Sequence, residues 1–196
     1  MNIVEETSVP AEALPLQAFR EHLRLGSGFS DDSLQDALLE STLRAAIGAI
    51  EYRTGKALFR RTFVLRLEEW AKGTFQPIMR GPLVQVDEVR IVTSGGSVTP
   101  VAASTYKVVP DNFRAGIEAL QTLPTVPANA HIEITFQAGY GANWQDVPES
   151  LAQATMVLGA HFYETRGGAP DTGLPMLVRV LIEAFRDLRL FGGRKR

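Results

Sequence analysis

His131 to Arg166 reads HIEITFQAGYGANWQDVPESLAQATMVLGAHFYETR, and this stretch changes its periodicity partway along. From His131 to Ala138 apolar and polar residues alternate, which is typical of a β-strand with one face buried. The Gly139-Tyr140-Gly141 turn closes this strand, and Val147-Pro148 opens a helix because proline suits the first helical turn. The helix is expected to end near Arg166. A strand leading directly into a long helix favours an α+β fold.

Two of the expected helices are apolar around most of their circumference. One is the helix after Pro148, and the other is capped by Ser30 with Asp31 and Asp32 and ends at Gly55, a suitable left-handed stop. Such helices must be covered on two sides, by their own domain or by a neighbouring subunit. The apolar residues assigned to a subunit interface as a hypothesis are Leu39, Leu43, Ile47, Met156 and Tyr163.

Residues between these helices follow a period of two. Strands are expected over about 63–67, 84–92, 98–101 and 106–108, with a hairpin turn at Ser94-Gly95-Gly96 and an irregular excursion from Asp111 to Pro127. The predicted fold class is α+β: a helical core of about four helices, a small antiparallel β-sheet inserted at about 60–138, and a C-terminal amphipathic helix with a tail.

The two ends of the chain differ in character. Residues 1–15 are expected to form a flexible arm, residues 16–168 the core with a short first helix over 16–25, and residues 169–196 a connector, a helix over 175–190 and a basic tail. The stripe expected to be buried on that last helix is Leu177, Leu181, Ala184, Phe185 and Leu188. Residues 179–196 hold six basic and two acidic residues, whereas residues 1–178 carry a net charge of −6. A basic end of this kind suits an acidic partner surface or a phosphate backbone.

Composition excludes several classes of function. The 196 residues include 20 Lys and Arg against 22 Asp and Glu, a net charge of −2, which argues against a protein whose whole surface grips nucleic acid. There is no cysteine, which excludes disulfides, Cys-ligated zinc, iron-sulfur clusters and thiol catalysis. Glu5 and Glu6 stand where a secretory signal would be basic, and no stretch is suited to spanning a membrane.

Candidates for chemistry are few. The three histidines are His22, His131 and His161, and only His161 with Glu164 has a suggestive i,i+3 spacing. Two residues do not make a metal site, because a catalytic zinc needs three converging protein ligands. Adjacent carboxylates such as Asp87 and Glu88 are better explained as solvated strand edges, and phosphate-binding glycine motifs are absent. We therefore assign no catalytic, cofactor-binding or metal residues and expect no cofactor.

Taken together, the order of these features resembles the head-tail connector (adaptor) family of tailed phages, including the neck adaptors of gene transfer agents. The similarity covers most of the chain from about Ala18 to Leu190. Its strongest signals are the TG-x-AL stop at Thr54 to Leu58, the AGYG turn at Ala138 to Gly141, and the HFYETR ending at His161 to Arg166. Gly81 departs from the pattern, since relatives often carry a second proline there.

This resemblance implies a non-enzymatic ring, commonly of twelve subunits, in the neck of a virion or phage-like particle assembled in the bacterial cytoplasm. The implied partners are other copies of the chain, the portal protein above, the next neck (stopper) protein below, and DNA passing through the lumen without sequence-specific binding. No membrane is involved. The residues assigned to portal binding as a hypothesis, because they supply an apolar anchor and positive charge, are Leu188, Arg189, Phe191, Arg194, Lys195 and Arg196.

Two alternatives stay open at this point. One is a soluble homo-oligomeric enzyme or small-ligand binder with a site near His161, Glu164 and Tyr140. The other is a nucleic-acid-binding adaptor that uses the basic tail. The sequence also leaves open the number of subunits and the choice between a phage and a gene transfer agent.

Overall fold

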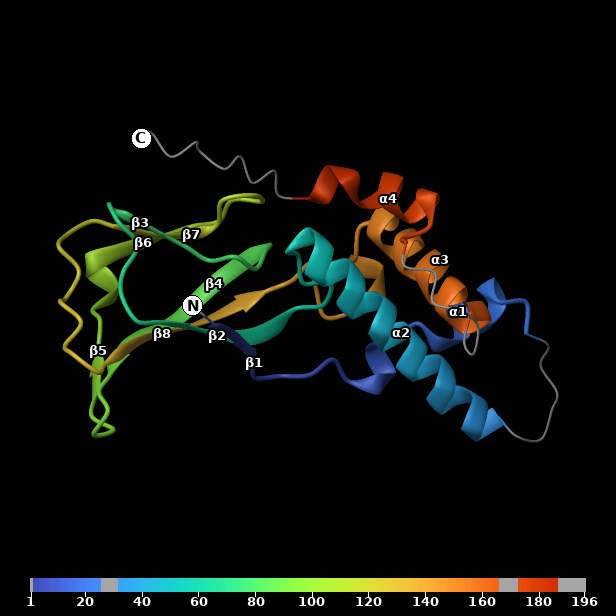
Figure 1. Ribbon diagram of the computed structural model, residues 1–196, viewed down its shortest axis with the longest axis horizontal. Coiled ribbons are helices and arrows are strands. Elements are labelled where there is room, and N and C mark those ends of the chain that lie inside the picture. Colours follow the sequence, from blue (N-terminus) through green and yellow to red (C-terminus); the bar gives the residue numbers. More distant parts are fainter. Residues whose placement is uncertain (1, 26–31, 166–172, 187–196) are drawn as a thin grey trace.

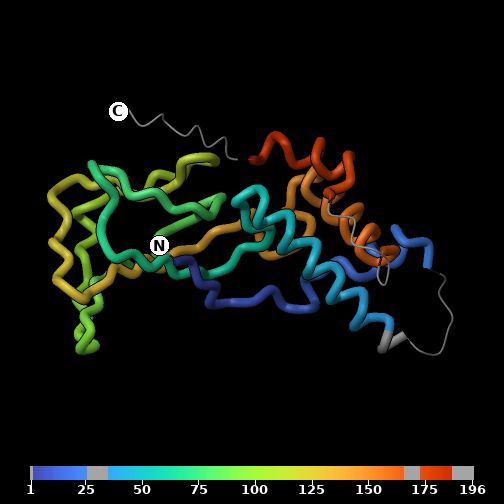
Figure 2. Tube along the Cα trace, in the orientation of Figure 1, coloured from blue at the N-terminus to red at the C-terminus, as the bar shows by residue number. Residues whose placement is uncertain are grey.

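The computed structural model describes residues 2–25, 32–165 and 173–186. Helices gather at one end of an elongated molecule and β-sheets at the other (Figures 1 and 2). The helices are α1 (Leu16–His22), α2 (Asp32–Thr54), α3 (Glu149–Thr165) and α4 (Met176–Ile182), and 3-10 turns lie at Ala11–Ala13, Ala103–Thr105, Trp144–Asp146 and Glu183–Phe185. The α+β class is confirmed. None of the described helices is both long enough and apolar enough to cross a membrane.

The sheet end contains two antiparallel sheets packed face to face. The larger sheet has the order β1-β2-β8-β4-β5 and the smaller one β3-β7-β6. Side chains from both sheets, among them Phe63, Ile117 and Ile134, form one buried apolar cluster between them. The strands are β1 (Asn2–Glu5), β2 (Arg61–Leu67), β3 (Phe75–Pro77), β4 (Leu83–Val92), β5 (Val98–Pro100), β6 (Tyr106–Val109), β7 (Gly116–Ala119) and β8 (His131–Ala138).

The stretch that decides the fold lies at the centre of this arrangement. Strand β8 pairs with β2 on one side and β4 on the other, and Ile132, Ile134 and Phe136 are fully buried, as their alternation predicts. The strands expected over 63–67, 84–92, 98–101 and 106–108 also form. The sheet region is larger than the small sheet predicted, because β7 forms within the supposed irregular excursion and pairs with β6 and with β3.

Residues 2–15 differ from the flexible arm expected for them. Asn2–Glu5 form strand β1, which pairs with β2 over four residues. Val9 and Leu14 are buried against the helices, and Arg44 Nη1 donates a hydrogen bond to the Val9 carbonyl at 2.9 Å. Backbone pairing and apolar burial therefore hold this segment against the rest of the chain.

Helix α2 is covered by its own chain on one of its apolar sides, whereas Leu38, Ala45 and Tyr52 on the other side are exposed. Leu39, Leu43 and Met156 pack in a buried cluster with Phe19 of α1, and Ile47 lies in a second cluster between α2, α3 and α4. These four residues, assigned to a subunit interface from the sequence, are thus buried within the single chain, at 0–7% exposed. The assignment of these four residues is corrected because α1, α3 and α4 already cover their side of the helix, and the side left open is that of Leu38, Ala45 and Tyr52.

Helix α4 buries a different stripe from the one predicted. Val178 and Ile182 are buried against α3, with Leu181 and Phe185 half-buried, whereas Leu177 and Ala184 are exposed. The run LVRVLI has apolar residues at nearly every position, so two stripes one residue apart fit its periodicity equally well. Leu188, on the predicted stripe, lies outside the described residues.

A buried ion pair joins the helical end to the sheets. Arg61 of β2 forms ion pairs with Glu51 of α2 and, at 2.8 Å, with Glu5. Glu51 Oε1 also accepts the Leu58 amide hydrogen at 2.7 Å. Burial lowers the pKa of Arg61, but the charges and hydrogen bonds of Glu51 and Glu5 outweigh it and leave the pKa raised.

Glycine is required where the last strand meets this junction. Gly139 has a φ of +130°, and a Cβ placed on it would lie 2.2 Å from the carbonyl oxygen of Phe59. Gly55, expected to stop α2, has a φ of +69° and fulfils that role. Gly139 thus lets the end of β8 approach Phe59 closely, and Gly55 ends α2 with its carbonyl accepting a hydrogen bond from Gly81 N at 3.0 Å.

Candidate assembly surface

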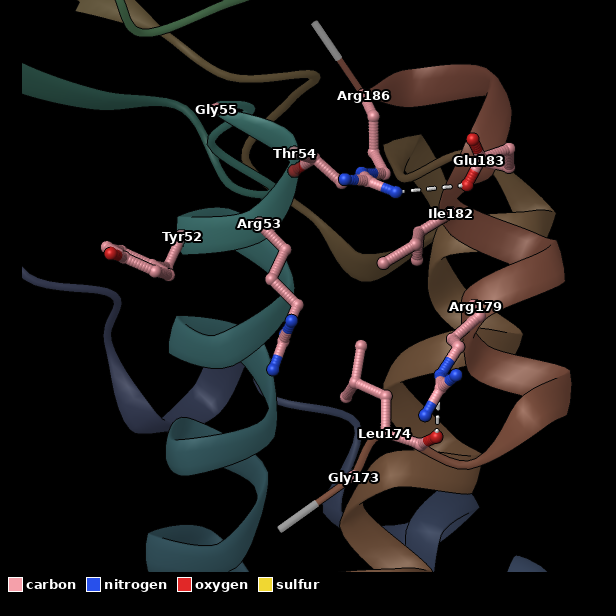
Figure 3. Close-up of a pocket in the computed structure, with 10 residues that line it drawn as sticks. All are labelled: Tyr52, Arg53, Thr54, Gly55, Gly173, Leu174, Arg179, Ile182, Glu183 and Arg186. Carbon is pink, nitrogen blue, oxygen red and sulfur yellow. Dashed lines mark hydrogen bonds and ion pairs between the residues drawn. The ribbon is translucent and has the colours of Figure 1, made fainter.

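A cavity of about 560 Å³ opens between the C-terminal end of α2 and helix α4 (Figure 3). We call it the basic cavity. Its lining residues come from the last turn of α2 and from the segment that begins at Gly173: Tyr52, Arg53, Thr54, Gly55, Gly173, Leu174, Arg179, Ile182, Glu183 and Arg186.

Three arginines and one glutamate give the basic cavity a positive charge. Arg186 Nη1 forms an ion pair with Glu183 at 3.2 Å, and Arg179 Nε donates to the Leu174 carbonyl at 3.0 Å. The Arg53 guanidinium has no hydrogen bond or ion pair with any residue that the structure describes. Figure 3 shows its side chain extending into the gap between the two helices. One carboxylate against three guanidiniums leaves room for added negative charge.

Exposed apolar side chains lie beside the basic cavity. Tyr52 is 88% exposed, and on α4 Met176 is 74%, Val180 61% and Leu177 51% exposed. Large apolar residues gathered on one region are characteristic of surfaces that other proteins cover. The region around α4 therefore combines positive charge with apolar contact area, as protein interfaces do.

The outer face of the larger sheet carries a second charged cluster. Glu133 of β8 is nearly buried and bonds Arg66 Nε at 2.8 Å, Arg90 Nη2 at 2.7 Å and His131 Nε2 at 3.2 Å. Burial raises the pKa of Glu133, but the hydrogen bonds and charges of Arg90, with help from His131 and Arg66, leave it below its usual value. All the acceptor capacity of this carboxylate is used within the sheet, so the cluster ties three strands together.

The alternative site near His161 gains no support from the geometry. His161 is half-buried on α3, where its ring packs near Phe162, and Glu164 is exposed. Within residues 2–25, 32–165 and 173–186 no three histidine or acidic side chains are grouped so as to hold a metal ion. Tyr140 lies elsewhere, at the turn after β8, and burial raises the pKa of its hydroxyl.

The other residues predicted from the sequence fall into two groups. Tyr163, the fifth residue assigned to a subunit interface, is half-buried on α3 beside the cluster around Phe19. The six residues assigned to portal binding lie outside the described part of the chain. Sequence reasoning identified Arg179 and Arg186 as part of a basic end but missed Arg53, which reaches the same cavity only because α2 and α4 both pack on α3.

Comparisons with known proteins give a consistent result over the whole chain. No family model and no curated protein matches it. Among solved structures, it is similar to a chain in the neck of an empty gene transfer agent (GTA) particle computed with C6 symmetry, with 46% identity and a TM-score of 0.90. It is also similar to a chain in the virion of a native GTA particle, with 47% identity and a TM-score of 0.87, and to one in the neck of a native GTA particle computed with C12 symmetry, with 43% identity and a TM-score of 0.86. Each similarity covers 100% of both chains. The chain therefore belongs to the family of gene transfer agent neck proteins, the head-tail connector (adaptor) proteins.

Proposed function

We propose that this protein is a structural adaptor that forms a ring, of twelve subunits, in the neck of a gene transfer agent particle. The observation that carries the proposal is similarity along the full chain, at 43–47% identity, to chains of GTA particles whose necks were solved with C6 and C12 symmetry. A ring built from identical chains needs no catalytic site. Its role is to hold partners in register around one axis.

The surface chemistry of the helical end suits this role. A closed ring uses a head-to-tail contact in which two different surfaces of each subunit meet. The exposed apolar side chains of α4 and the charged basic cavity supply one such surface. Ile47, Val178 and Ile182 lie in the buried cluster beneath α4.

The portal protein is the partner proposed above the ring. The contact residues remain those of the carboxyl-terminal segment, which combines apolar anchors with positive charge: Leu188, Arg189, Phe191, Arg194, Lys195 and Arg196. The next neck protein is proposed to meet loops of the sheet end, including the β4–β5 turn. That turn is closed by Gly96 N donating to the Thr93 carbonyl at 2.9 Å. DNA passes through the lumen without sequence-specific contacts, and assembly occurs in the bacterial cytoplasm.

Native mass spectrometry of the protein mixed with its cognate portal tests the proposal. A stoichiometric ring of this chain on the portal is the expected result. A chain truncated after Leu188 should keep its melting temperature but lose portal binding, because it lacks Phe191 and the last three basic residues. The absence of any complex between the full-length chain and the portal would overturn the proposed function.

A further inference from the structure

Segments of opposite charge lie on the two sides of helix α2: an acidic N-terminal segment on one side and the basic cavity on the other. Arg44 holds the acidic arm, which we define as residues 5–12, by donating to the Val9 carbonyl. Arg53 lies nine residues further on, and nine residues at 3.6 per turn rotate the side chain by about 180° around the helix axis. The acidic arm and the basic cavity therefore lie on opposite sides of α2, and Figures 1 and 2 show the segment that follows β1 on one side of this helix and α4 on the other.

The acidic arm presents two carboxylates that are not ion-paired with any described residue of their own chain. The arm contains three glutamates and no basic residue. Glu5 pairs with Arg61, but the side chains of Glu6 and Glu12 are exposed, and their carboxylates make no hydrogen bond or ion pair with any described residue. Pairing of β1 with β2 and the burial of Val9 hold the arm in place, so little conformational entropy is lost when it binds.

We propose that the basic cavity of one subunit receives the acidic arm of the next copy around the ring, with Glu6 and Glu12 facing Arg53 and Arg179. This inference rests on the proposed ring and names the two surfaces that join its members. Because the arm and the cavity lie on opposite sides of α2, they cannot meet within one chain. They can meet between chains, in the head-to-tail contact that closes a ring.

Charge and apolar area both favour a second copy as the occupant. The incoming arm supplies the negative charge that the three arginines leave unbalanced. Docking at this place covers the exposed side chains of Tyr52, Met176 and Val180. Charge complementarity of this kind fixes the orientation of partners and suppresses wrong pairings. A copy whose acidic arm is bound in a neighbour's basic cavity still has its own basic cavity free to receive the arm of the following copy.

Charge reversal with compensation is the first test, carried out on the full chain loaded on the cognate portal. Arg53→Glu with Arg179→Glu should raise the protein concentration for half-maximal ring formation roughly tenfold or more, because like charges then face each other. Glu6→Arg with Glu12→Arg should do the same. The variant carrying all four changes should recover ring formation, because each interface is again complementary. Matched controls reverse exposed charges elsewhere: Arg60→Glu and Glu69→Arg should load normally.

Cross-linking gives a readout that depends on position. The chain has no cysteine, so Arg53→Cys combined with Glu12→Cys creates a single defined pair. A short bis-maleimide should link portal-bound copies into a ladder of multimers, whereas either single variant, or Arg60→Cys with Glu12→Cys, should give none.

The outcomes separate this inference from the proposed function. Wild-type rings on the portal, together with reversed variants that load normally or a double-cysteine variant without a ladder, would overturn the inference and leave the adaptor role intact. Absence of wild-type rings would overturn both. Loss of affinity for a DNA duplex in Arg53→Glu with Arg179→Glu, with ring formation unchanged, would instead make the cavity a phosphate-binding site and refute the contact between copies.

Discussion

Replacing Arg61 by methionine tests the junction between helices and sheets. The side chains of Arg61 and Glu51 are each only 7% exposed. Methionine keeps much of the apolar length of arginine but removes the charge, so the Glu51 carboxylate stays buried with the Leu58 amide as its remaining donor. Removing one partner of a buried ion pair costs about 3–5 kcal/mol, because the other charge is left uncompensated. We expect Arg61→Met to lose a free energy of unfolding in this range.

Urea unfolding of the isolated protein, followed by circular dichroism, measures this loss. Arg60→Met is the matched control, since Arg60 is the preceding residue and is exposed, and it should change stability by less than about 0.5 kcal/mol. Adding Glu51→Gln to Arg61→Met should recover part of the loss. The amide removes the unpaired charge, and its oxygen can still accept the Leu58 hydrogen.

Two results would refute this reasoning. A loss below about 1 kcal/mol for Arg61→Met would mean that the pair contributes no more than a surface ion pair. A double variant no more stable than Arg61→Met would mean that the loss comes from packing and not from the uncompensated Glu51 charge.

Three further changes probe the sheet, a turn and a helix. Glu133→Gln should be about 1–2 kcal/mol less stable than the wild type at pH 7 in urea unfolding. The folded pKa of Glu133 lies below its usual 4.5, so the ionised carboxylate makes its full contribution to stability above pH 4.5 and loses it as the pH falls through the folded pKa. The difference in free energy of unfolding between wild type and Glu133→Gln should therefore disappear in acid. A difference that stays constant with pH would contradict the role given to the Glu133 charge. Gly139→Ala should lose at least about 2 kcal/mol, seen as a lower melting temperature, because its Cβ would lie 2.2 Å from the Phe59 carbonyl oxygen; an unchanged melting temperature would count against that close approach. Gly48→Ala should gain up to about 1 kcal/mol in free energy of unfolding, or about 2–4 °C in melting temperature, because a Cβ at this position of α2 meets nothing within 4 Å. A melting temperature below that of the wild type would show a contact not seen in the single chain.

The periodicity of apolar residues predicted those helices and strands that are long enough to show which of their faces is buried. Strand β8 alternates cleanly because one face lies on the core, and α3 begins beside Pro148 as expected. Strands β3 and β7 have three and four residues and no alternation long enough to detect, since partner strands define them. Strand β1 escaped notice for the same reason, because its order depends on pairing with β2, far along the chain.

The candidate site depended even more on tertiary structure. The basic character of residues 179–196 drew attention to Arg179 and Arg186, but nothing local marks Arg53, which is one charged residue at a helix end. The subunit assignment of Leu39 and Leu43 went wrong because sequence shows that a helix face must be covered and not which chain covers it. Here the Phe19 side chain of α1 is the cover.

The edges of both sheets have a consequence for how copies of this chain can associate. The edge strands β1, β3, β5 and β6 have three or four residues each, Pro77 and Pro100 end two of them, and Pro110 follows a third. Short edges that end at proline offer few free backbone groups to a strand from another molecule. At these four edge strands, pairing between the sheets of neighbouring copies during particle assembly is therefore disfavoured. Contacts made by side chains alone can still form and dissociate, which allows a misplaced copy to leave before the ring closes.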